Sequence, residues 1–233
     1  MTRKEYLNKL KTTYQFVHTI VDKDDYAIYH LRHKQLKKDL ILRYYNKKIS
    51  AYDELLKITC KNLPEIYDVI YLNDGTIVFE EYINGITVAD VMANEKYRYR
   101  GVKKVITSVC YALNVLHERN LVHRDVKPEN ILIDNTGRVV LIDFNASKKM
   151  SSAKKDTVIM GTVGYISPEQ LGIAQSDERT DIYALGILLN VMLTGKHPSV
   201  ELAKGKAGRI VRKCTNVNPD ERFQNVIKLI DAL

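Results

Sequence analysis

The chain has 233 residues, of which 45% are hydrophobic and 27% are charged. This balance leaves enough apolar surface for a folded core and excludes an intrinsically disordered chain. The formal net charge of +8 could suit an anionic partner, but the lysines and arginines occur in short clusters rather than in runs of five to eight. The sequence therefore does not favour a nucleic-acid partner.

The longest apolar stretch, residues 182–193, is shorter than the roughly 20 residues that a transmembrane helix needs. The first residues, from Met1 to Tyr6, lack the apolar run of a signal peptide. We therefore expect a cytoplasmic protein with no membrane span.

The first third of the sequence is typical of an antiparallel sheet with one helix. Short runs that alternate apolar and polar residues, separated by polar turns, predict strands at residues 26–31, 40–45, 66–71 and 76–81. Ser50 has the character of a helix N-cap. A helix that follows it would carry Leu55, Ile58 and Thr59 on one face.

The remainder of the sequence is mainly helical in pattern. Apolar residues recur at helical spacing between Val105 and Leu116, which predicts a long helix that ends near Asn120. Two short strands and then a core helix are predicted at residues 131–133, 139–142 and 181–194. A strand-rich first part followed by a helical second part indicates the α+β class.

A polar segment lies between the long helix and the next predicted strand, where a loop is expected. Its sequence is His123-Arg-Asp-Val-Lys-Pro-Glu-Asn130. Taken singly, such residues are common in turns. In this order and spacing they resemble the catalytic loop of the protein kinase family.

The resemblance continues in chain order beyond this loop. Asp143-Phe-Asn145 stands eighteen residues after Asp125, where kinases have their metal-binding Asp-Phe-Gly. Further segments resemble the end of the activation segment, the helix that anchors the second lobe and a late arginine motif, at Gly161–Glu169, Asp181–Gly186 and Pro219–Phe223. The matches run from about residue 20 to the C-terminus and are most similar to bacterial, eukaryotic-like Ser/Thr kinases.

The resemblance implies a single protein kinase domain over residues 1–233 with a bilobal α+β fold. Residues 1–82 would form a small antiparallel N-lobe with one helix, and residues 83–233 a mainly helical C-lobe.

The same resemblance implies roles for the polar residues of the two loops. Asp125 would accept or orient the proton of the substrate hydroxyl, and Lys127 would reach the transferring phosphoryl group of the nucleotide. Asn130 and Asp143 would bind ATP through Mg²⁺, since both carry the oxygen atoms that this ion prefers. ATP and Mg²⁺ are the implied cofactors, and proteins with Ser or Thr acceptors are the implied partners.

Other residues have structural roles by resemblance. These residues include His123, Arg124, Phe144 and Asp181, the last of which starts the segment that resembles the helix anchoring the second lobe. Glu169 and Arg222 would form a buried ion pair that fixes the activation segment to the helical lobe.

The resemblance also implies regulation by phosphorylation. Lys127 together with Thr162 is the Ser/Thr-kinase pattern rather than the tyrosine-kinase one. Arg124 directly before the catalytic aspartate implies that a phosphorylated activation segment controls the enzyme. Thr157 is the leading acceptor, and the alternatives are Ser151, Ser152 and Thr162. Self-association for autophosphorylation is a further expectation.

The first lobe departs from the family where ATP is held. Kinases cover the phosphates with a loop of three glycines, but residues 21–26 contain none and include Asp22, Asp24 and Asp25. At an effective dielectric near 20, one carboxylate about 8 Å from a phosphate charge costs about 2 kcal/mol. We therefore expect these carboxylates either to face solvent or to share a cation with the phosphates.

The strand lysine of the family is also replaced, because Arg43 stands at its position. By the family offset, its expected partner is Glu54 in the predicted helix. Main-chain groups of Glu81 and Ile83 would bind adenine, and Glu80 would control the pocket behind the base. Arginine keeps the charge of lysine but not its compact ammonium.

Asn145 replaces the glycine of the Asp-Phe-Gly motif. Asparagine tolerates left-handed backbone angles better than most residues. We therefore expect the turn to survive the replacement.

Three functions are compatible with these residues. The first is an ATP-dependent Ser/Thr protein kinase that also phosphorylates its own activation segment, because the catalytic set is complete. The second is a pseudokinase that binds nucleotide or serves as a scaffold, which the altered first lobe favours. The third, a kinase-fold phosphotransferase for small molecules, is disfavoured by the extended activation segment.

Overall fold

The computed structural model describes residues 1–94, 97–150, 161–171 and 175–233. It divides into two compact units. The first contains Met1–Cys60 and Pro64–Asn84, and the second contains Lys61–Leu63 and Gly85–Leu233.

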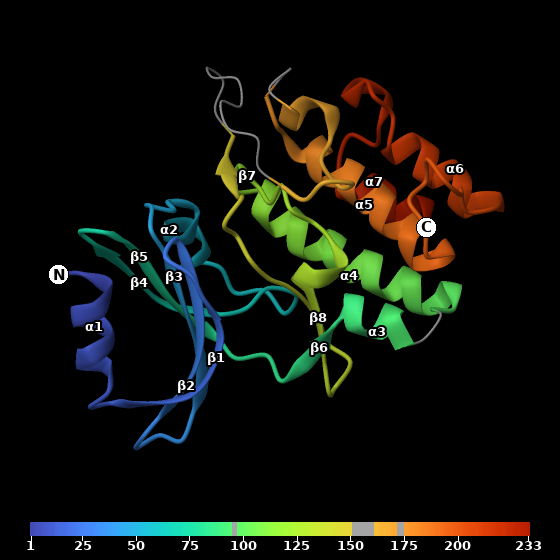
Figure 1. The fold of residues 1–233 in the computed structure, drawn as a ribbon. Helices are drawn as coiled ribbons and strands as arrows, with labels where there is room; N and C mark the ends of the chain where they lie inside the picture. The colour runs from blue at the N-terminus through green and yellow to red at the C-terminus, as the bar shows by residue number, and fades with distance from the viewer. Residues whose placement is uncertain (95–96, 151–160, 172–174) are drawn as a thin grey trace. The chain divides into compact units, whose positions relative to one another are not determined.

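The first unit is built on a five-stranded antiparallel sheet in the order β1-β2-β3-β5-β4 (Figure 1). Its strands are β1 (Tyr14–Asp22), β2 (Tyr26–His33), β3 (Asp39–Tyr45), β4 (Ile66–Leu72) and β5 (Gly75–Glu81). The four predicted strands are therefore confirmed, whereas β1 was not foreseen. Strand β1 lies at the sheet edge and is mostly exposed, so its sequence lacks the apolar alternation that marks a half-buried strand.

The central strand β3 is buried on both faces, because an α-helix covers each side of the sheet. Alternate residues along a strand point to opposite faces. One face carries an apolar core that consists of Ala27, Tyr29, Leu31, Leu40, Leu42, Tyr44, Ile77 and Phe79. The opposite face carries Arg43 and Tyr45, so Arg43 lies on the face away from this core.

Helix α1 (Arg3–Leu10) covers the apolar core of the sheet (Figure 1). Leu10 is buried in the core, with Tyr6 and Leu7 packed beside it. A capping box starts the helix, since Thr2 accepts from the Glu5 N–H and the Glu5 carboxylate accepts from the Thr2 N–H. The predicted N-lobe with one helix is thus wrong: the first unit has two. The Thr2-x-x-Glu5 pattern was the available signal.

Helix α2 (Ala51–Leu55) packs on the other face of the sheet, where the Tyr52 hydroxyl lies 2.9 Å from that of Tyr45. The helix follows Ser50 as predicted, but the Ser50 side chain makes no capping hydrogen bond. The helix also ends before Ile58 and Thr59, so the expected apolar face is one turn shorter. Ile58 is nevertheless buried, because the chain after the helix remains packed.

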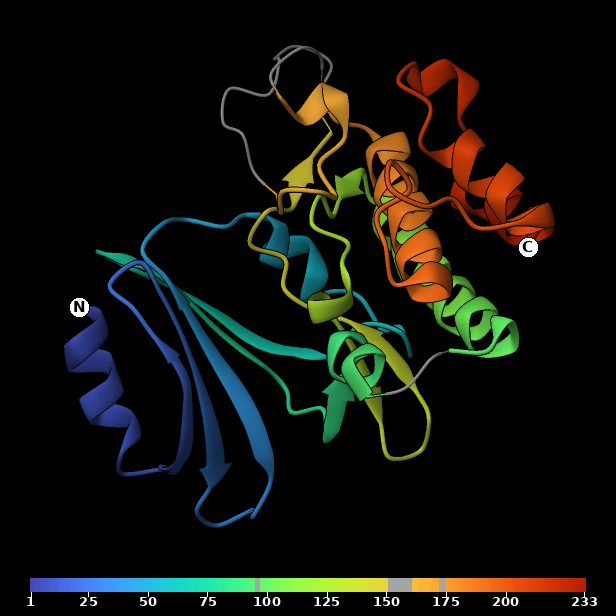
Figure 2. The ribbon, with the colours of Figure 1, turned by 45° about the vertical axis from the view of Figure 1, so that its right-hand side comes forward.

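The second unit is mainly helical, as predicted. Its α-helices are α3 (Val88–Asn94), α4 (Tyr99–His117), α5 (Glu178–Thr194), α6 (Gly205–Cys214) and α7 (Val226–Ala232). Helices α4 and α5 lie side by side, with α7 against α4 and α6 against α5 (Figure 2). Two small sheets accompany them, β6 (Gly85–Thr87) with β8 (Ile131–Asp134) and β9 (Val139–Leu141), and β7 (Leu121–Val122) with β10 (Lys148–Lys149).

Helix α5 forms the centre of the second unit, because it is apolar on nearly every side. It starts earlier than predicted, where Asp177 caps the Arg179 N–H, and it ends at Gly195 with a left-handed φ of 73°. Gly186 allows α6 to approach closely, since a Cβ there would lie 2.4 Å from the Cβ of Cys214.

In the parts of the chain that the structure describes, no helix is both long and apolar enough to span a bilayer.

The packing of α1 can be tested by truncating its buried leucine. We expect Leu10→Ala to lower the free energy of unfolding by about 2–3 kcal/mol, because it removes buried methyl groups and leaves a cavity. Leu36→Ala is the matched control, since Leu36 is 73% exposed. Urea denaturation followed by circular dichroism measures both. Equal stability of the two variants would contradict the packing of α1 on the sheet.

Candidate active site

The predicted catalytic loop is held by Asp181, a fully buried residue of α5. The His123 N–H donates to one carboxylate oxygen of Asp181 at 2.9 Å, and the Arg124 N–H donates to the other at 2.8 Å. The Nε2 atom of His117, on α4, lies 2.8 Å from the same carboxylate. A single side chain therefore fixes the start of the loop to the two central helices.

Hydrogen bonds set the charge of Asp181, and burial sets that of His123. Burial alone would raise the pKa of Asp181, but hydrogen bonds and the nearby histidines more than offset it, so its pKa is lowered. Burial also lowers the pKa of His123, in spite of nearby carboxylates that act in the opposite direction. At neutral pH, Asp181 is thus an anion that accepts hydrogen bonds, and His123 is a neutral ring.

Two residues at the site have left-handed backbone angles that non-glycine residues rarely adopt. The φ angle of Arg124 is 70° and that of Asp143 is 67°. Such angles cost of order 1–3 kcal/mol each and persist where the surroundings fix them. At Arg124 the bond to Asp181 provides this constraint.

The expectation for Asn145 was wrong in one respect. Its φ angle is not positive, and the left-handed residue of this turn is Asp143. The Asn145 N–H donates to the Asp143 carboxylate at 3.2 Å. The asparagine therefore closes the turn without needing the conformational freedom of the glycine that it replaces.

Asp125 and Asn130 contact each other within one loop, and a main-chain hydrogen bond joins this loop to the segment that contains Asp143. The Asn130 side-chain amide donates to both the carbonyl and the carboxylate of Asp125, at 2.9 Å each. The main-chain carbonyl of Asn130 accepts from the Ile142 N–H at 2.9 Å, and Asp143 is the next residue along the chain. The contact of Asp125 with Asn130 is therefore present, and the chain places Asp143 next to a residue bonded to Asn130.

The donor set of Asn130 and Asp143 suits a hard cation such as Mg²⁺. Both hydrogens of the Asn130 amide are used by Asp125, so its carbonyl oxygen is the atom left for a ligand. Among the described residues, no group of three or more His, Cys, Asp and Glu side chains is placed to hold a metal ion. A site with two protein ligands is compatible with Mg²⁺, which usually keeps waters and binds substrate phosphates.

Asp125, the predicted catalytic aspartate, belongs to a triangle of polar contacts. Lys127 Nζ lies 2.9 Å from the Asp125 carboxylate, and it donates to the Thr162 hydroxyl at 2.6 Å. That hydroxyl donates to the other oxygen of Asp125 at 2.7 Å. Burial raises the pKa of Asp125, but the bonds from Lys127 and Thr162 outweigh it, so its pKa is lowered and the carboxylate is ionised at neutral pH.

The segment after Thr162 is fastened to the catalytic loop by a residue that sequence analysis did not single out. The Gln170 side-chain amide donates to the Arg124 carbonyl at 3.0 Å, and its carbonyl accepts from the N–H and hydroxyl of Ser167 at 3.1 Å each. Phe144 is fully buried and meets the His123 ring edge-on at 5.4 Å. Gln170 and His117 carried no sequence signal, because their roles depend on contacts between distant segments.

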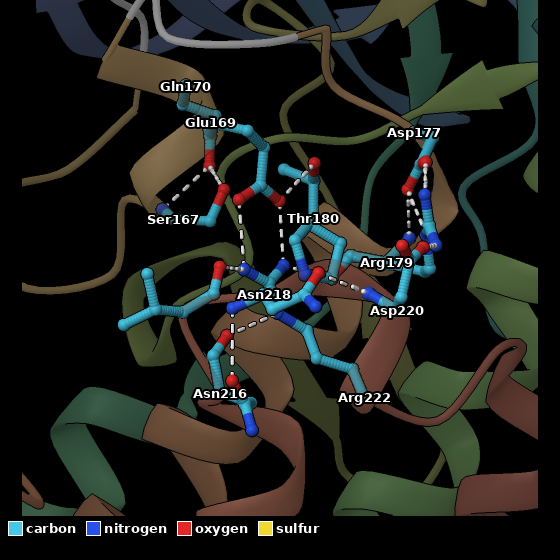
Figure 3. A network of polar contacts seen from close by, with 12 residues as sticks. Ser167, Glu169, Gln170, Asp177, Arg179, Thr180, Asn216, Asn218, Asp220 and Arg222 are labelled. Carbon is cyan, nitrogen blue, oxygen red and sulfur yellow. Dashed lines mark hydrogen bonds and ion pairs between the residues drawn. The ribbon is translucent and has the colours of Figure 1, made fainter.

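The predicted ion pair between Glu169 and Arg222 is confirmed and lies in a wider polar network (Figure 3). Two guanidinium nitrogens of Arg222 donate to the two oxygens of Glu169 at 2.7 and 2.9 Å. Thr180 donates to Glu169 at 2.9 Å, and the Arg179 carbonyl accepts from Arg222 at 2.9 Å. Burial raises the pKa of Glu169, but these bonds outweigh it and the pKa is lowered.

In the first unit, Arg43 lies on β3 and is held by a partner that was not foreseen. Arg43 Nε donates to the Glu80 carboxylate at 2.6 Å, and its Nη1 donates to the Tyr26 hydroxyl at 2.9 Å. The expected partner, Glu54, is 3.7 Å from Lys57 Nζ. Glu81 is the last residue of β5, and Ile83 is buried just beyond it.

The aspartates of the glycine-free turn face solvent, which is one of the two alternatives expected. Asp22, Asp24 and Asp25 are all exposed. Asp22 accepts a hydrogen bond from Arg3 of α1, which also donates to the Lys23 carbonyl at 3.0 Å. The turn is thus partly neutralised from the protein's own first helix.

The leading acceptor Thr157, with Ser151 and Ser152, lies outside the described residues. Of the four candidates, the structure describes only Thr162.

Residues 13–231 match the protein kinase domain family, and the chain belongs to that family. It is therefore a protein kinase domain.

Its relatives include several bacterial Ser/Thr kinases. A probable serine/threonine-protein kinase of Clostridium acetobutylicum is 28% identical over 89% of this chain and 35% of its own length. The serine/threonine-protein kinase PrkC of Bacillus subtilis is 34% identical over 59% of this chain and 22% of its own. The serine/threonine-protein kinase PknB of Mycolicibacterium smegmatis is 33% identical over 66% of this chain and 25% of its own length. The chain thus corresponds to about a third or less of the length of these relatives.

The buried ion pair can be tested by removing its cation. We expect Arg222→Met to lower the free energy of unfolding by about 3–5 kcal/mol, because Glu169 would remain buried without its partner. Chemical denaturation at neutral pH measures the loss.

The matched control is Lys196→Met, which removes the partner of Glu201 from an ion pair that is about half exposed. An exposed pair contributes at most about 1 kcal/mol. Similar losses in both variants would show that burial does not give the Glu169 pair its importance.

Proposed function

We propose that the chain is an ATP-dependent Ser/Thr protein kinase that transfers the γ-phosphoryl group to serine and threonine hydroxyls, including those of its own activation segment. The proposal rests on one observation above all: the Asp125 carboxylate is held by Asn130, Lys127 and Thr162. A chain that served only as a scaffold would need none of these contacts.

In the proposed reaction, the oxygen of a substrate hydroxyl attacks the γ-phosphorus, and the bond between that phosphorus and the β–γ bridging oxygen breaks to release ADP. Asp125 orients the attacking hydroxyl and accepts its proton, which its lowered pKa allows only late in the transfer. Lys127 carries the positive charge nearest to this carboxylate and would stabilise the transferring phosphoryl group.

Asn130 and Asp143 would hold Mg²⁺ through their side-chain oxygens. The bound ion would neutralise charge on the nucleotide phosphates. The hydrogen bonds from Asn130 to Asp125 couple this ligand to the catalytic carboxylate, so a change at either residue disturbs both. Arg43 would bind the phosphates, and main-chain groups of Glu81 and Ile83 would bind adenine.

Thr162 has a specific part in this proposal. Its hydroxyl accepts from Lys127 and donates to Asp125, so it bonds both members of the direct ion pair between these side chains. This arrangement supports Ser/Thr specificity and argues that Thr162 is a positioning residue. We therefore assign the regulatory phosphate to Thr157, which would pair with Arg124.

The central test is phosphoryl transfer itself. Purified protein is incubated with Mg·ATP and a generic protein substrate such as myelin basic protein, and intact masses are measured. We expect mass gains of whole phosphates in the wild type and none in Asp125→Ala, because Asp125 orients the nucleophile. Asp231→Ala, which changes an exposed aspartate of α7, is the control and should behave as wild type.

Phosphorylation that persists in Asp125→Ala would remove Asp125 from its assigned role. Nucleotide binding without any mass gain in the wild type would favour the pseudokinase. Peptide mapping of the phosphorylated chain then tests Thr157 as the acceptor.

The bridging hydroxyl gives a second test. We expect Thr162→Val to lower kcat about tenfold or more, because a hydrogen bond to a charged group is worth about 1.5–3 kcal/mol and 1.4 kcal/mol corresponds to tenfold in rate. Thr162→Ser keeps the hydroxyl and should stay within about threefold of wild type. Steady-state kinetics at saturating ATP measure both, and a fully active valine variant would contradict the bridge.

A further inference from the structure

A buried ion pair between Arg43 of β3 and Glu80 of β5 lies within the sheet of the first unit. Arg43 replaces the strand lysine, and Glu80 occupies the position assigned to the pocket behind adenine. Their side chains are 5% and 2% exposed, and Arg43 Nε lies 2.6 Å from Glu80 Oε1. Both charges are therefore nearly removed from water.

The pairing follows from the strand register. Arg43 is opposite Val78 and Ile41 is opposite Glu80, so Arg43 and Glu80 are diagonal neighbours on one face of the β3–β5 pair. Diagonal neighbours are within reach of long side chains. On the other side, Tyr26 of β2 reaches Arg43 at 2.9 Å, so adjacent strands hold the guanidinium from two directions.

These contacts define the orientation of the guanidinium. The group is planar and carries five N–H donors in a fixed arrangement. Glu80 binds the Nε–H, and Tyr26 binds one Nη1–H, which fixes the plane at two points. A guanidinium held in this way is a planar group of the kind that suits a phosphate.

We infer that Glu80 is the positioning residue for Arg43, and that the two are a matched pair that replaces the family lysine in binding the nucleotide phosphates. The inference rests on the proposed function, because it requires that the chain bind ATP. It assigns the pair to the sheet itself, where the two partners stand on the paired strands β3 and β5.

The pair has a consequence for a variant in which lysine replaces Arg43. Restoring lysine alone should not improve nucleotide binding. An ammonium lacks the Nε–H that Glu80 binds, and it is a compact charge that the buried carboxylate would hold close to itself. Glu80 positions the guanidinium in this chain but would retain a lysine away from the phosphates.

The test is a double-mutant cycle on the full chain with Glu80→Gln, Arg43→Lys and both together. The dissociation constant for Mg·ATP is measured by titration calorimetry, and KM for ATP, kcat and the melting temperature are measured in parallel. We expect each single variant to weaken ATP binding about tenfold and to raise KM more than it lowers kcat. The double variant should be no weaker than either single one, because the two residues act as a unit.

Asp39→Asn is the matched control, because it removes a carboxylate of β3 that pairs with Arg32 of the neighbouring strand β2. We expect its affinity for ATP to stay within about twofold of wild type. Wild-type affinity in a folded Glu80→Gln variant, or a loss of about a hundredfold in the double variant, would overturn the inference. If Glu80→Gln does not fold, Glu80→Asp, which shortens the side chain by one methylene, provides the same comparison.

A measurement without nucleotide separates this inference from the proposed function. In ¹⁵N NMR spectra, the Arg43 Nε–H should give a slowly exchanging signal, assigned by its loss in Arg43→Lys. We expect Glu80→Gln to shift this signal and to speed its exchange with solvent, while Asp39→Asn leaves it unchanged. No change in Glu80→Gln would overturn the pair, whereas an intact pair in a chain that does not bind ATP would overturn the nucleotide role.

Discussion

The site depends on the hydrogen bonds that the carboxylate of Asp181 accepts from the loop. This carboxylate is fully buried in α5, and it accepts hydrogen bonds from the first two main-chain N–H groups of the catalytic loop. A buried carboxylate without these donors would be strongly destabilising, and a loop without this acceptor would leave two buried N–H groups unpaired. Each side therefore requires the other, and the left-handed angle at Arg124 is maintained by that mutual requirement.

Much of the second unit could be predicted from the sequence, since its signals are local. The helical spacing of apolar residues predicted α4, and an almost continuously apolar stretch predicted α5. The order of the motifs predicted that the loop of Asp125 and Asn130 lies beside the segment of Asp143. The Glu169–Arg222 pair followed from family resemblance. The contacts of Gln170 and His117 could not be predicted, because each bonds a group far away in the chain and neither residue type specifies such a partner.

The first unit was harder to predict for physical reasons. Its edge strand β1 is exposed and has little apolar alternation. The partner of Arg43 depends on the register between β3 and β5, which sets which diagonal neighbour is within reach. A family offset pointed instead to Glu54. The ion pair between Arg43 and Glu80 depends on the pairing of β3 with β5, which the sequence alone does not specify.

Helix α1 precedes the residues that match the family, which start at residue 13. Leu10 of this helix is nevertheless buried in the core of the sheet, and Arg3 pairs with Asp22 of the acidic turn. A version of the protein trimmed to the family boundary would present Phe79 and its neighbours to water as an uncovered apolar patch. Such a patch promotes aggregation, so the trimmed domain would be expected to precipitate at concentrations that the longer chain tolerates.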